Sequence, residues 1–264
     1  MNILEEILEY KRQEIEFAKR TIQLEQLKDM PHFTRQCFSL QKALNEKDIA
    51  VIAEIKKASP SKKVIREDFD PLEIACKYVS GGASALSVLT DNKYFQGDIR
   101  FIEDIRSSVP IPILRKDFII DSYQLAEAKA FGADAVLLIA AALKPERMRD
   151  LFDEAIELGL ECLVEVHKIR ELNIINFIPV KIIGINNRDL SNFTIDISTT
   201  IRVASRIPKD IIVVSESGIT NGADIDKLNA HGIRAVLIGE SLMRAHNPGE
   251  ALRALLTSKK GKRK

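Results

Sequence analysis

The stretch GADAVLLIA, residues 132–140, indicates how this chain folds. A glycine leads into a run that is apolar on both faces, which is typical of a strand in a parallel sheet covered on each side. The opening of the stretch returns as GASAL at 82–86 and as GIRAV at 232–236, with glycine, two residues, alanine and then the run. Such a repeated turn favours a closed array of strand–helix units over two unlike domains.

Similar apolar runs recur from residue 49 onward, each followed by a loop and an amphipathic charged stretch. The eight runs are 49–56, 85–90, 111–118, 135–140, 161–166, 181–186, 211–217 and 235–240. Between them, Asp70 and Pro71 would begin a helix with Gly81 as the C′ glycine just past its end, and Asp121 would cap one that ends at Gly132. The sequence therefore predicts an α/β fold, a (βα)8 or TIM barrel, over residues 49–258. An open doubly wound sheet is the alternative, but no G-x-G-x-x-G follows the first run to favour it.

Residues 1–48 lie outside the repeat and are predicted to form a helical extension that covers the barrel. One helical stripe of this segment is apolar and is interrupted by Lys11; its members are Leu4, Leu8, Ile15, Ala18 and Ile22. The stripe must pack either on a barrel opening or on a partner subunit, so we expect a monomer or a weak homodimer. A second, shorter helix is expected at 39–45, and the basic tail at 259–264 is expected to be disordered.

The charge balance argues against some classes of partner. Lys and Arg total 39 against 38 Asp and Glu, for a net charge of +1, so no long-range field recruits nucleic acid or an anionic membrane. The three cysteines have no metal-type spacing. No segment has the length and apolarity of a signal peptide or a membrane span. We therefore expect a cytoplasmic protein with neither nucleic acid nor membrane as a partner.

Ionisable residues stand at the ends of alternate predicted strands. They are Glu54 and Lys56 on the first, Lys116 on the third, Glu165 on the fifth and Glu216 on the seventh. Successive side chains of a strand point to opposite faces, so each of these residues shares a face with the apolar residue two positions before it. Alternate strands fill the same layers of a barrel, and the C-terminal ends of the strands carry the chemistry. One such charge is usually solvated or paired, but five converging charges favour a catalytic site, because burying unpaired charge costs several kcal/mol per ion.

Glycine-containing turns follow the last two predicted strands, in SESGI at 215–219 and IGES at 238–241. Gly218 and Gly239 would let backbone N–H groups approach an anion, and this corner of the barrel is its usual phosphate site. Ser59 and Lys62 follow the first strand and could reach the same phosphate, although they could equally belong to an ordinary loop.

These residues resemble the indole-3-glycerol-phosphate synthase family, over nearly the whole chain. The similar motifs are AEIKKASPS at 53–61, LSVLTD at 86–91 with FQG at 95–97, LRKDF at 114–118, LVEV at 163–166, INNRDL at 185–190, SESGI at 215–219 and IGESLM at 238–243. The resemblance implies a TIM barrel with a helical extension and a carboxyphenylamino-deoxyribulose 5-phosphate as substrate. It implies ring closure with loss of CO₂ and water, in tryptophan biosynthesis, without a cofactor or a metal.

The resemblance also implies roles for individual residues. Lys116 would be the general acid at the ketone oxygen, Glu165 the general base, and Lys56 a contact to the substrate carboxylate and a second proton donor. The supporting residues would be Glu54 beside the lysines, Asn186, Arg188 and Glu216 to orient the substrate, Ser59, Ser217, Gly218, Gly239 and Glu240 at the phosphate, and Phe118 and Leu137 against the aromatic ring. Some family members carry Lys or Arg where this chain has Ala58, so Lys57 or Lys62 would have to supply that charge.

Three questions stay open at the level of sequence. Neighbouring lysines depress each other's pKa whereas the glutamates raise it, so the net direction is undetermined. Another phosphate-binding barrel, such as a sugar-phosphate isomerase or epimerase, would share the corner at Gly218 and Gly239. It would leave the lysines and glutamates unexplained, and an epimerase would usually show strand-end histidines that bind metal. A catalytically inactive barrel that only binds its ligand is the remaining alternative.

Overall fold

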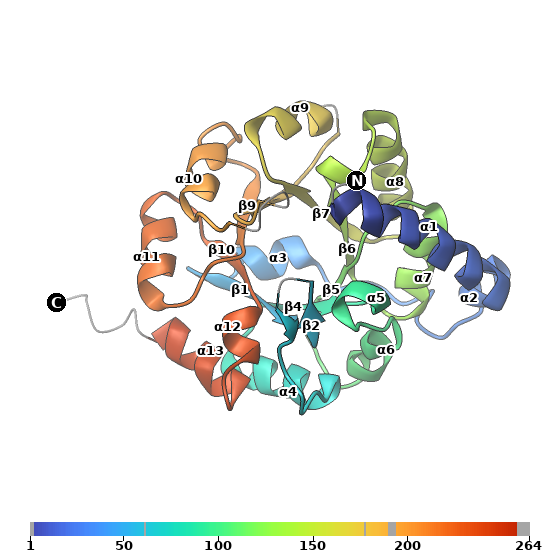
Figure 1. The fold of residues 1–264 in the computed structure, drawn as a ribbon, viewed down its shortest axis with the longest axis horizontal. Coiled ribbons are helices and arrows are strands. Elements are labelled where there is room, and N and C mark those ends of the chain that lie inside the picture. The colour runs from blue at the N-terminus through green and yellow to red at the C-terminus, as the bar shows by residue number, and fades with distance from the viewer. Residues whose placement is uncertain (1–2, 61, 177, 190–193, 258–264) are drawn as a thin grey trace.

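The computed structural model describes residues 3–60, 62–176, 178–189 and 194–257. Eight parallel strands close into a barrel in the order β1-β10-β9-β8-β7-β6-β5-β4, which Figure 1 shows end-on. The strands are β1 (Ala50–Ile55), β4 (Ala85–Leu89), β5 (Ile113–Lys116), β6 (Ala135–Ile139), β7 (Glu161–Val166), β8 (Ile182–Asn186), β9 (Ile212–Glu216) and β10 (Ala235–Ile238). Each lies within one of the eight apolar runs, so the predicted TIM barrel is confirmed.

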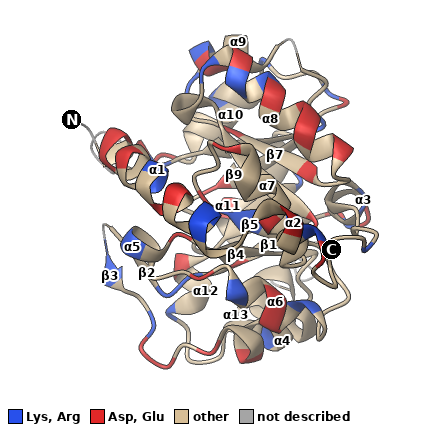
Figure 2. Ribbon diagram, turned by 90° about the vertical axis from the view of Figure 1, so that its right-hand side faces the viewer, with Lys and Arg blue, Asp and Glu red and all other residues tan. Residues whose placement is uncertain are grey.

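Helices follow the barrel strands and form the outer ring. They are α4 (Pro71–Gly81), α5 (Asn92–Phe95), α6 (Arg100–Arg106), α7 (Ser122–Ala130), η1 (Ala140–Ala142), α8 (Pro145–Glu157), η2 (Ile169–Glu171), α9 (Leu172–Ile175), α10 (Ser198–Ala204), α11 (Gly222–Ala230), α12 (Glu240–Met243) and α13 (Pro248–Thr257). Their outer faces carry charges of both signs in an interspersed pattern (Figure 2). None of the described helices is long and apolar enough to cross a membrane.

Two hydrophobic clusters show which face of each strand points inward. A smaller cluster fills the barrel interior and includes Ile52, Leu114, Leu163 and Val214, each two residues before an ionisable position. A larger cluster, with Val51, Leu86 and Val136 among its members, lies between the strands and the helices. The alternation therefore places Glu54, Lys116, Glu165 and Glu216 on the inward face, as the period of two predicts.

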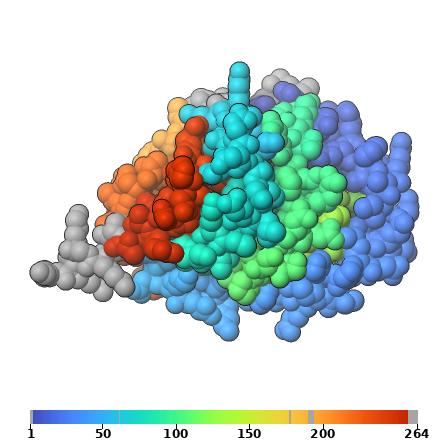
Figure 3. All heavy atoms as spheres, turned by 90° about the horizontal axis from the view of Figure 1, so that it is seen from below, coloured from blue at the N-terminus to red at the C-terminus, as the bar shows by residue number. Residues whose placement is uncertain are grey.

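The C-terminal end of α4 differs from the prediction in one residue. Asp70 caps α4 and Pro71 begins it as expected, but the left-handed residue at its end is Gly82, with φ +98°, and not Gly81. Gly81 lies inside the helix, where a Cβ would collide with the backbone carbonyl of Gly249. Figure 3 shows the last helical segment, in red, packed beside α4, in cyan. Gly81 is therefore needed for this close approach of α4 and α13.

The N-terminal segment forms three helices, α1 (Ile3–Thr21), α2 (Leu24–Lys28) and α3 (Leu40–Asn45). Ser39 caps α3 and its hydroxyl donates to Glu161 Oε1 at 2.7 Å, at the start of β7. Leu40 and Leu44 of α3 join the interior cluster, so α3 packs at the end of the barrel where the strands begin. In Figure 1 α3 lies behind the strands and α1 in front of them.

Lys11 does not break the covered face of α1 but lies at its centre. The buried residues of α1 are Ile7, Lys11 and Ile15. Of the predicted stripe only Ile15 is buried, and Leu4, Leu8, Ala18 and Ile22 are partly buried. A short hairpin of β2 (Ala58–Ser59) and β3 (Lys63–Val64) follows β1 and was not anticipated from sequence. The predicted tail at 259–264 lies outside the described residues.

Candidate active site

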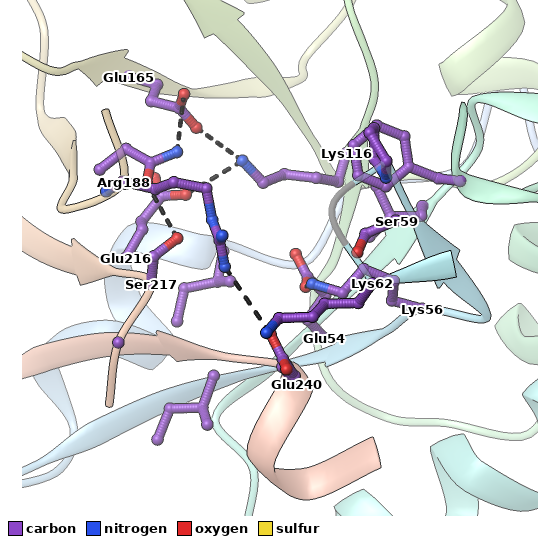
Figure 4. Close-up of a pocket in the computed structure, with 18 of the residues that line it drawn as sticks. Glu54, Lys56, Ser59, Lys62, Lys116, Glu165, Arg188, Glu216, Ser217 and Glu240 are labelled. Atoms are coloured by element: carbon purple, nitrogen blue, oxygen red, sulfur yellow. Dashed lines mark hydrogen bonds and ion pairs between the residues drawn. The ribbon is translucent and has the colours of Figure 1, made fainter. Parts of the chain in front are cut away.

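A cavity of about 500 Å³ opens at the C-terminal end of the barrel strands. Every site residue predicted from sequence lines it: Glu54, Lys56, Ser59, Lys116, Phe118, Leu137, Glu165, Asn186, Arg188, Glu216, Ser217, Gly218, Gly239 and Glu240. Figure 4 shows ten of the lining residues pointing toward one another from the barrel strands and their loops. Helix α1 adds Ile3, Leu4 and Ile7 to the wall.

Lys116 lies between two buried glutamates on one side of the cavity. Its Nζ is 2.7 Å from Glu165 Oε2 and 3.0 Å from Glu216 Oε2. Asn186 Nδ2 donates to the other oxygen of Glu165 at 3.3 Å. The side chain of Lys116 is 12% exposed, while those of both glutamates are below 5%. The ammonium group thus reaches the cavity from a carboxylate-lined wall.

A second lysine forms its own ion pair nearby. Lys56, directly after β1, contacts Glu54 Oε1, and its side chain is 16% exposed. Glu54 in turn fits against the backbone of Gly239, where a Cβ would overlap the same carboxylate oxygen. The cavity therefore holds two separate lysine–glutamate groups, one at β1 and one at β5, β7 and β9 (Figure 4).

The glutamates decide the direction in which the pKa of Lys116 moves. Burial acts to lower the pKa of Lys116, but the charges of Glu165, Glu216 and Glu54 outweigh it and raise the pKa above its ordinary value. Burial likewise acts to raise the pKa of Glu165, but Lys116 and His167 reverse this and lower it. The pKa of Glu216 is raised, because burial and the Glu165 charge together exceed the effect of Lys116. The depressed lysine pKa that neighbouring lysines would cause is therefore not found at Lys116.

Two turns at the ends of β9 and β10 form another part of the wall. Ser217 and Gly218 both adopt left-handed backbone, with φ of 66° and 84°. Asn187 holds this turn, donating through Nδ2 to the Ser217 carbonyl and to Ser215 Oγ at 3.0 Å each. The hydroxyl of Ser241 donates to the Ile219 carbonyl at 3.1 Å and ties the second turn to the first. Gly239, at the second turn, has a negative φ of −126°.

Further polar and apolar residues complete the wall of the cavity. Asn186 Oδ1 accepts from the Arg188 backbone N–H at 3.0 Å and from Ser217 Oγ at 2.9 Å. Arg188 also approaches Glu240 at 3.7 Å. Phe118 packs against Phe95 with ring centroids 6.3 Å apart, beside Leu137. A flat apolar ring would find contacts here and an anionic group would find cations elsewhere in the same cavity.

Sequence reasoning missed two residues that shape this site. Gly184 of β8 leaves room for the Glu216 carboxylate, since a Cβ at this position would overlap Glu216 Oε1. A glycine inside a strand signals such a close approach, so the sequence did hold a clue. The second is His167, directly after β7, whose ring lies 3.3 Å from Glu165. Of the two lysines that could replace a charge at Ala58, Lys62 lines the cavity and Lys57 does not.

The fold and this cavity define a class, a TIM-barrel enzyme with a lysine–glutamate site at the C-terminal ends of its strands. Residues 4–255 match the family model described as indole-3-glycerol phosphate synthase. The chain therefore belongs to the indole-3-glycerol phosphate synthase family.

Curated relatives agree with the family match. The indole-3-glycerol phosphate synthase of Salinibacter ruber is 47% identical over 257 residues, which cover 97% of this chain and 95% of the relative. That of Bacteroides thetaiotaomicron is 46% identical over 255 residues, covering 97% and 98%. That of Burkholderia cenocepacia is 48% identical over 255 residues, covering 95% and 97%.

More distant solved structures share the fold alone. Thiamine phosphate pyrophosphorylase from Pyrococcus furiosus superposes with a TM-score of 0.60 at 15% identity, covering 83% of this chain and 96% of that one. KGPDC from Streptococcus mutans gives a TM-score of 0.60 at 13% identity, covering 79% and 95%.

Proposed function

We propose that this chain converts 1-(2-carboxyphenylamino)-1-deoxyribulose 5-phosphate to indole-3-glycerol phosphate, with loss of CO₂ and water, in tryptophan biosynthesis. The observation that carries the proposal is the position of Lys116 Nζ between Glu165 and Glu216, 2.7 Å and 3.0 Å away, inside a cavity with a second paired lysine. Ring closure needs a proton donor at a ketone oxygen and a base that restores aromaticity, and this arrangement supplies both.

Lys116 acts first in the proposed sequence. Its raised pKa keeps it protonated near neutral pH, so it can donate a hydrogen bond and then a proton to the ketone oxygen. The ring carbon that bears the carboxylate attacks the ketone carbon, and a carbon–carbon bond forms as the oxygen becomes a hydroxyl. Loss of CO₂ from that ring carbon returns the bonding electrons to the aromatic ring.

Dehydration completes the proposed reaction. Lys56 contacts the substrate carboxylate before it leaves and then protonates the departing hydroxyl, which leaves as water, with Glu54 supporting both groups. Glu165 removes the proton whose loss forms the indole double bond. Asn186, Arg188 and Glu216 orient the substrate around these atoms. This division of labour fits the two separate lysine–glutamate groups of the cavity.

The substrate's two ends are proposed to occupy different parts of the wall. Phe118 and Leu137 would flank the aromatic ring. Ser59 and the turns at Ser217, Gly218, Gly239 and Glu240 would bind the phosphate, with Lys62 adding positive charge where Ala58 has none. The sugar phosphate is the only partner we propose. A monomer or weak homodimer is supported by α1, whose Ile7 and Ile15 are buried within the single chain. A cytoplasmic location is supported by the family's biosynthetic role.

Fluorescence tests the proposed function directly. The chain has four tyrosines and no tryptophan, so new indole emission would stand out against the protein background. Purified protein is mixed with the carboxyphenylamino-deoxyribulose phosphate and no added cofactor. We expect emission to grow at a rate proportional to enzyme concentration. A flat trace from folded protein would contradict the proposal and favour an isomerase or an inactive binding protein.

A further inference from the structure

His167 lies behind the cavity wall with its ring between two carboxylates. It follows β7, two residues after Glu165, and its Nε2 is 3.3 Å from Glu165 Oε1. Its Nδ1 is 3.6 Å from Glu171 Oε2, on η2. Glu171 also accepts the backbone N–H of His167 at 2.7 Å, through the same oxygen. The side chain of His167 is 6% exposed, so solvent does not replace these neighbours.

The two carboxylates beside the ring favour its protonated state. A neutral imidazole has one N–H donor, whereas an imidazolium has two. In the described part of the chain, neither ring nitrogen has a well-aligned hydrogen-bond partner, and both face carboxylates. An imidazolium places a positive charge within 3.6 Å of both carboxylates. A neutral ring would turn a lone pair toward one of two buried negative groups.

The charges around His167 come from several elements. Glu165 on β7 and Glu171 on η2 are its direct neighbours, Glu216 on β9 lies further off, and Lys116 of β5 contacts the far oxygen of Glu165. Burial acts to lower the pKa of His167, but Glu171 and Glu165 reverse this and raise it. The carboxylates on three elements therefore favour a protonated ring at the pH where Glu165 must be ionised.

We propose that His167, held by Glu171, is a positioning residue that keeps Glu165 ionised when Lys116 leaves it for the substrate. The inference rests on the proposed function, in which Glu165 is the base and Lys116 the acid. In the structure Lys116 pairs with Glu165 Oε2. Once Lys116 turns to the ketone oxygen, Glu165 stays buried close to Glu216 and without that cation. His167 remains at Oε1 and stops Glu165 from taking up a proton before its step.

The pH dependence of turnover tests this role. The acid limb of kcat reports the ionisation of the base in the enzyme–substrate complex, the state in which Lys116 has turned from Glu165 to the substrate. We expect His167→Asn to move that limb upward by about one pH unit, a tenfold change in protonation ratio, with KM changed less than kcat. Glu171→Gln should move it in the same direction by a smaller amount. A matched control is His231→Asn, which removes an exposed histidine bonded to the Lys227 carbonyl and should leave the profile unchanged.

A merely structural role for His167 would give a different result. Loss of packing would lower the active fraction at every pH and leave the acid limb in place. An unmoved limb in His167→Asn, with the protein folded, would therefore overturn the inference.

A titration without substrate separates this inference from the proposed function. The chain has four histidines, and the ring signals of His167 in nuclear magnetic resonance spectra are the ones lost in His167→Asn. We expect them to titrate above the ordinary value of 6.5 and to move back toward it in Glu171→Gln. A ring that is neutral at pH 6.5 would overturn the inference even if turnover is normal. A raised titration together with no indole formation would instead contradict the proposed function.

Discussion

Lys11 Nζ lies 2.8 Å from Asp117 Oδ1, which joins the N-terminal helix to the residue directly after Lys116. The same ammonium group is 2.8 Å from Asp91 Oδ2 and 2.7 Å from Glu14 Oε2. Asp117 also accepts from Thr90 Oγ1 at 2.6 Å and from Arg115 at 3.1 Å. A helix outside the barrel repeat thereby fixes the ends of β4 and β5, and Lys116 stands on the second of these strands.

Replacing Lys11 by methionine should destabilise the protein strongly. Lys11 is 1% exposed, and its loss would leave Asp91 and Asp117 buried without their shared cation. Removal of one partner from a buried ion pair typically costs about 3–5 kcal/mol. Urea unfolding measures the change. The control is Arg12→Met, one residue away, because Arg12 and Glu9 form an exposed pair worth about 1 kcal/mol or less. Equal shifts in the two variants would contradict the prediction.

Lys116→Ala should abolish most turnover while the protein still folds. Lys116 is the only lysine that contacts Glu165 in the described part of the chain, and Lys56 pairs with Glu54 instead. Loss of a proton-transfer group usually costs roughly 10²- to 10⁴-fold in rate. Steady-state indole fluorescence measures the rate, and circular dichroism checks the fold. Turnover within about tenfold of wild type would remove Lys116 from the general-acid role.

The barrel could be predicted from sequence because its signals are local and repeated. Each apolar run specifies a strand by itself, and the glycine-alanine turns recur before three of them. The site residues could be predicted for a related reason. Glu54, Lys116, Glu165 and Glu216 stand at strand ends, and the barrel topology alone brings those ends together.

Contacts between distant segments could not be predicted in this way. Nothing near Lys11 in the sequence identifies Asp91 and Asp117 as its partners, so Lys11 read as an interruption of an apolar stripe. The close approach of Gly81 to Gly249 likewise depends on how α4 and α13 pack. The direction of the Lys116 pKa depends on a balance between burial and three glutamates, which residue types alone do not determine.

Gly184→Ala should impair catalysis more than stability. A Cβ at Gly184 would overlap the carboxylate of Glu216 and push it away from Lys116. The end of a glutamate can rotate, so the fold adapts while the site does not. A displacement of about 1 Å in an active site can cost about 10²-fold in rate.

A double-mutant cycle checks the cause of the Gly184→Ala effect. In a Glu216→Ala background the added methyl group has no carboxylate to displace. We therefore expect Gly184→Ala to have little further effect on turnover there. The same fold-loss in both backgrounds would show that Gly184 acts through another contact.

Glu216→Gln should become more stable than the wild type as pH rises. Burial is the largest effect on the pKa of Glu216 and raises it above its ordinary 4.5. Lys116 acts to lower the pKa, but the charge of Glu165 adds to the effect of burial. A carboxyl group with a higher pKa in the folded chain binds more protons there, so the free energy of unfolding falls as it ionises. That fall begins near pH 4.5 and is complete above the raised pKa. Glutamine cannot ionise, so the variant's advantage should grow across this window while its activity falls.

Urea midpoints at a series of pH values test the Glu216 prediction. The matched control is Glu157→Gln on α8, which changes the net charge equally at an exposed position. Its stability difference from wild type should stay nearly constant with pH. A Glu216→Gln protein whose relative stability declines with pH would mean that Glu216 is stabilised as a carboxylate in the folded state.

Lys62→Ala should weaken substrate binding without slowing chemistry. Lys62 lines the cavity near Ser59 and Glu240 (Figure 4), whereas Lys57 does not line it. A charge-assisted contact to the phosphate is worth about 1.5–3 kcal/mol, so KM should rise about tenfold or more. The phosphate does not react, and its binding is the same in the ground and transition states, so kcat should stay nearly constant. Lys57→Ala is the matched control. A rise of KM in Lys57→Ala alone would transfer the phosphate contact to Lys57, and a fall in kcat for Lys62→Ala would place Lys62 in the chemical step.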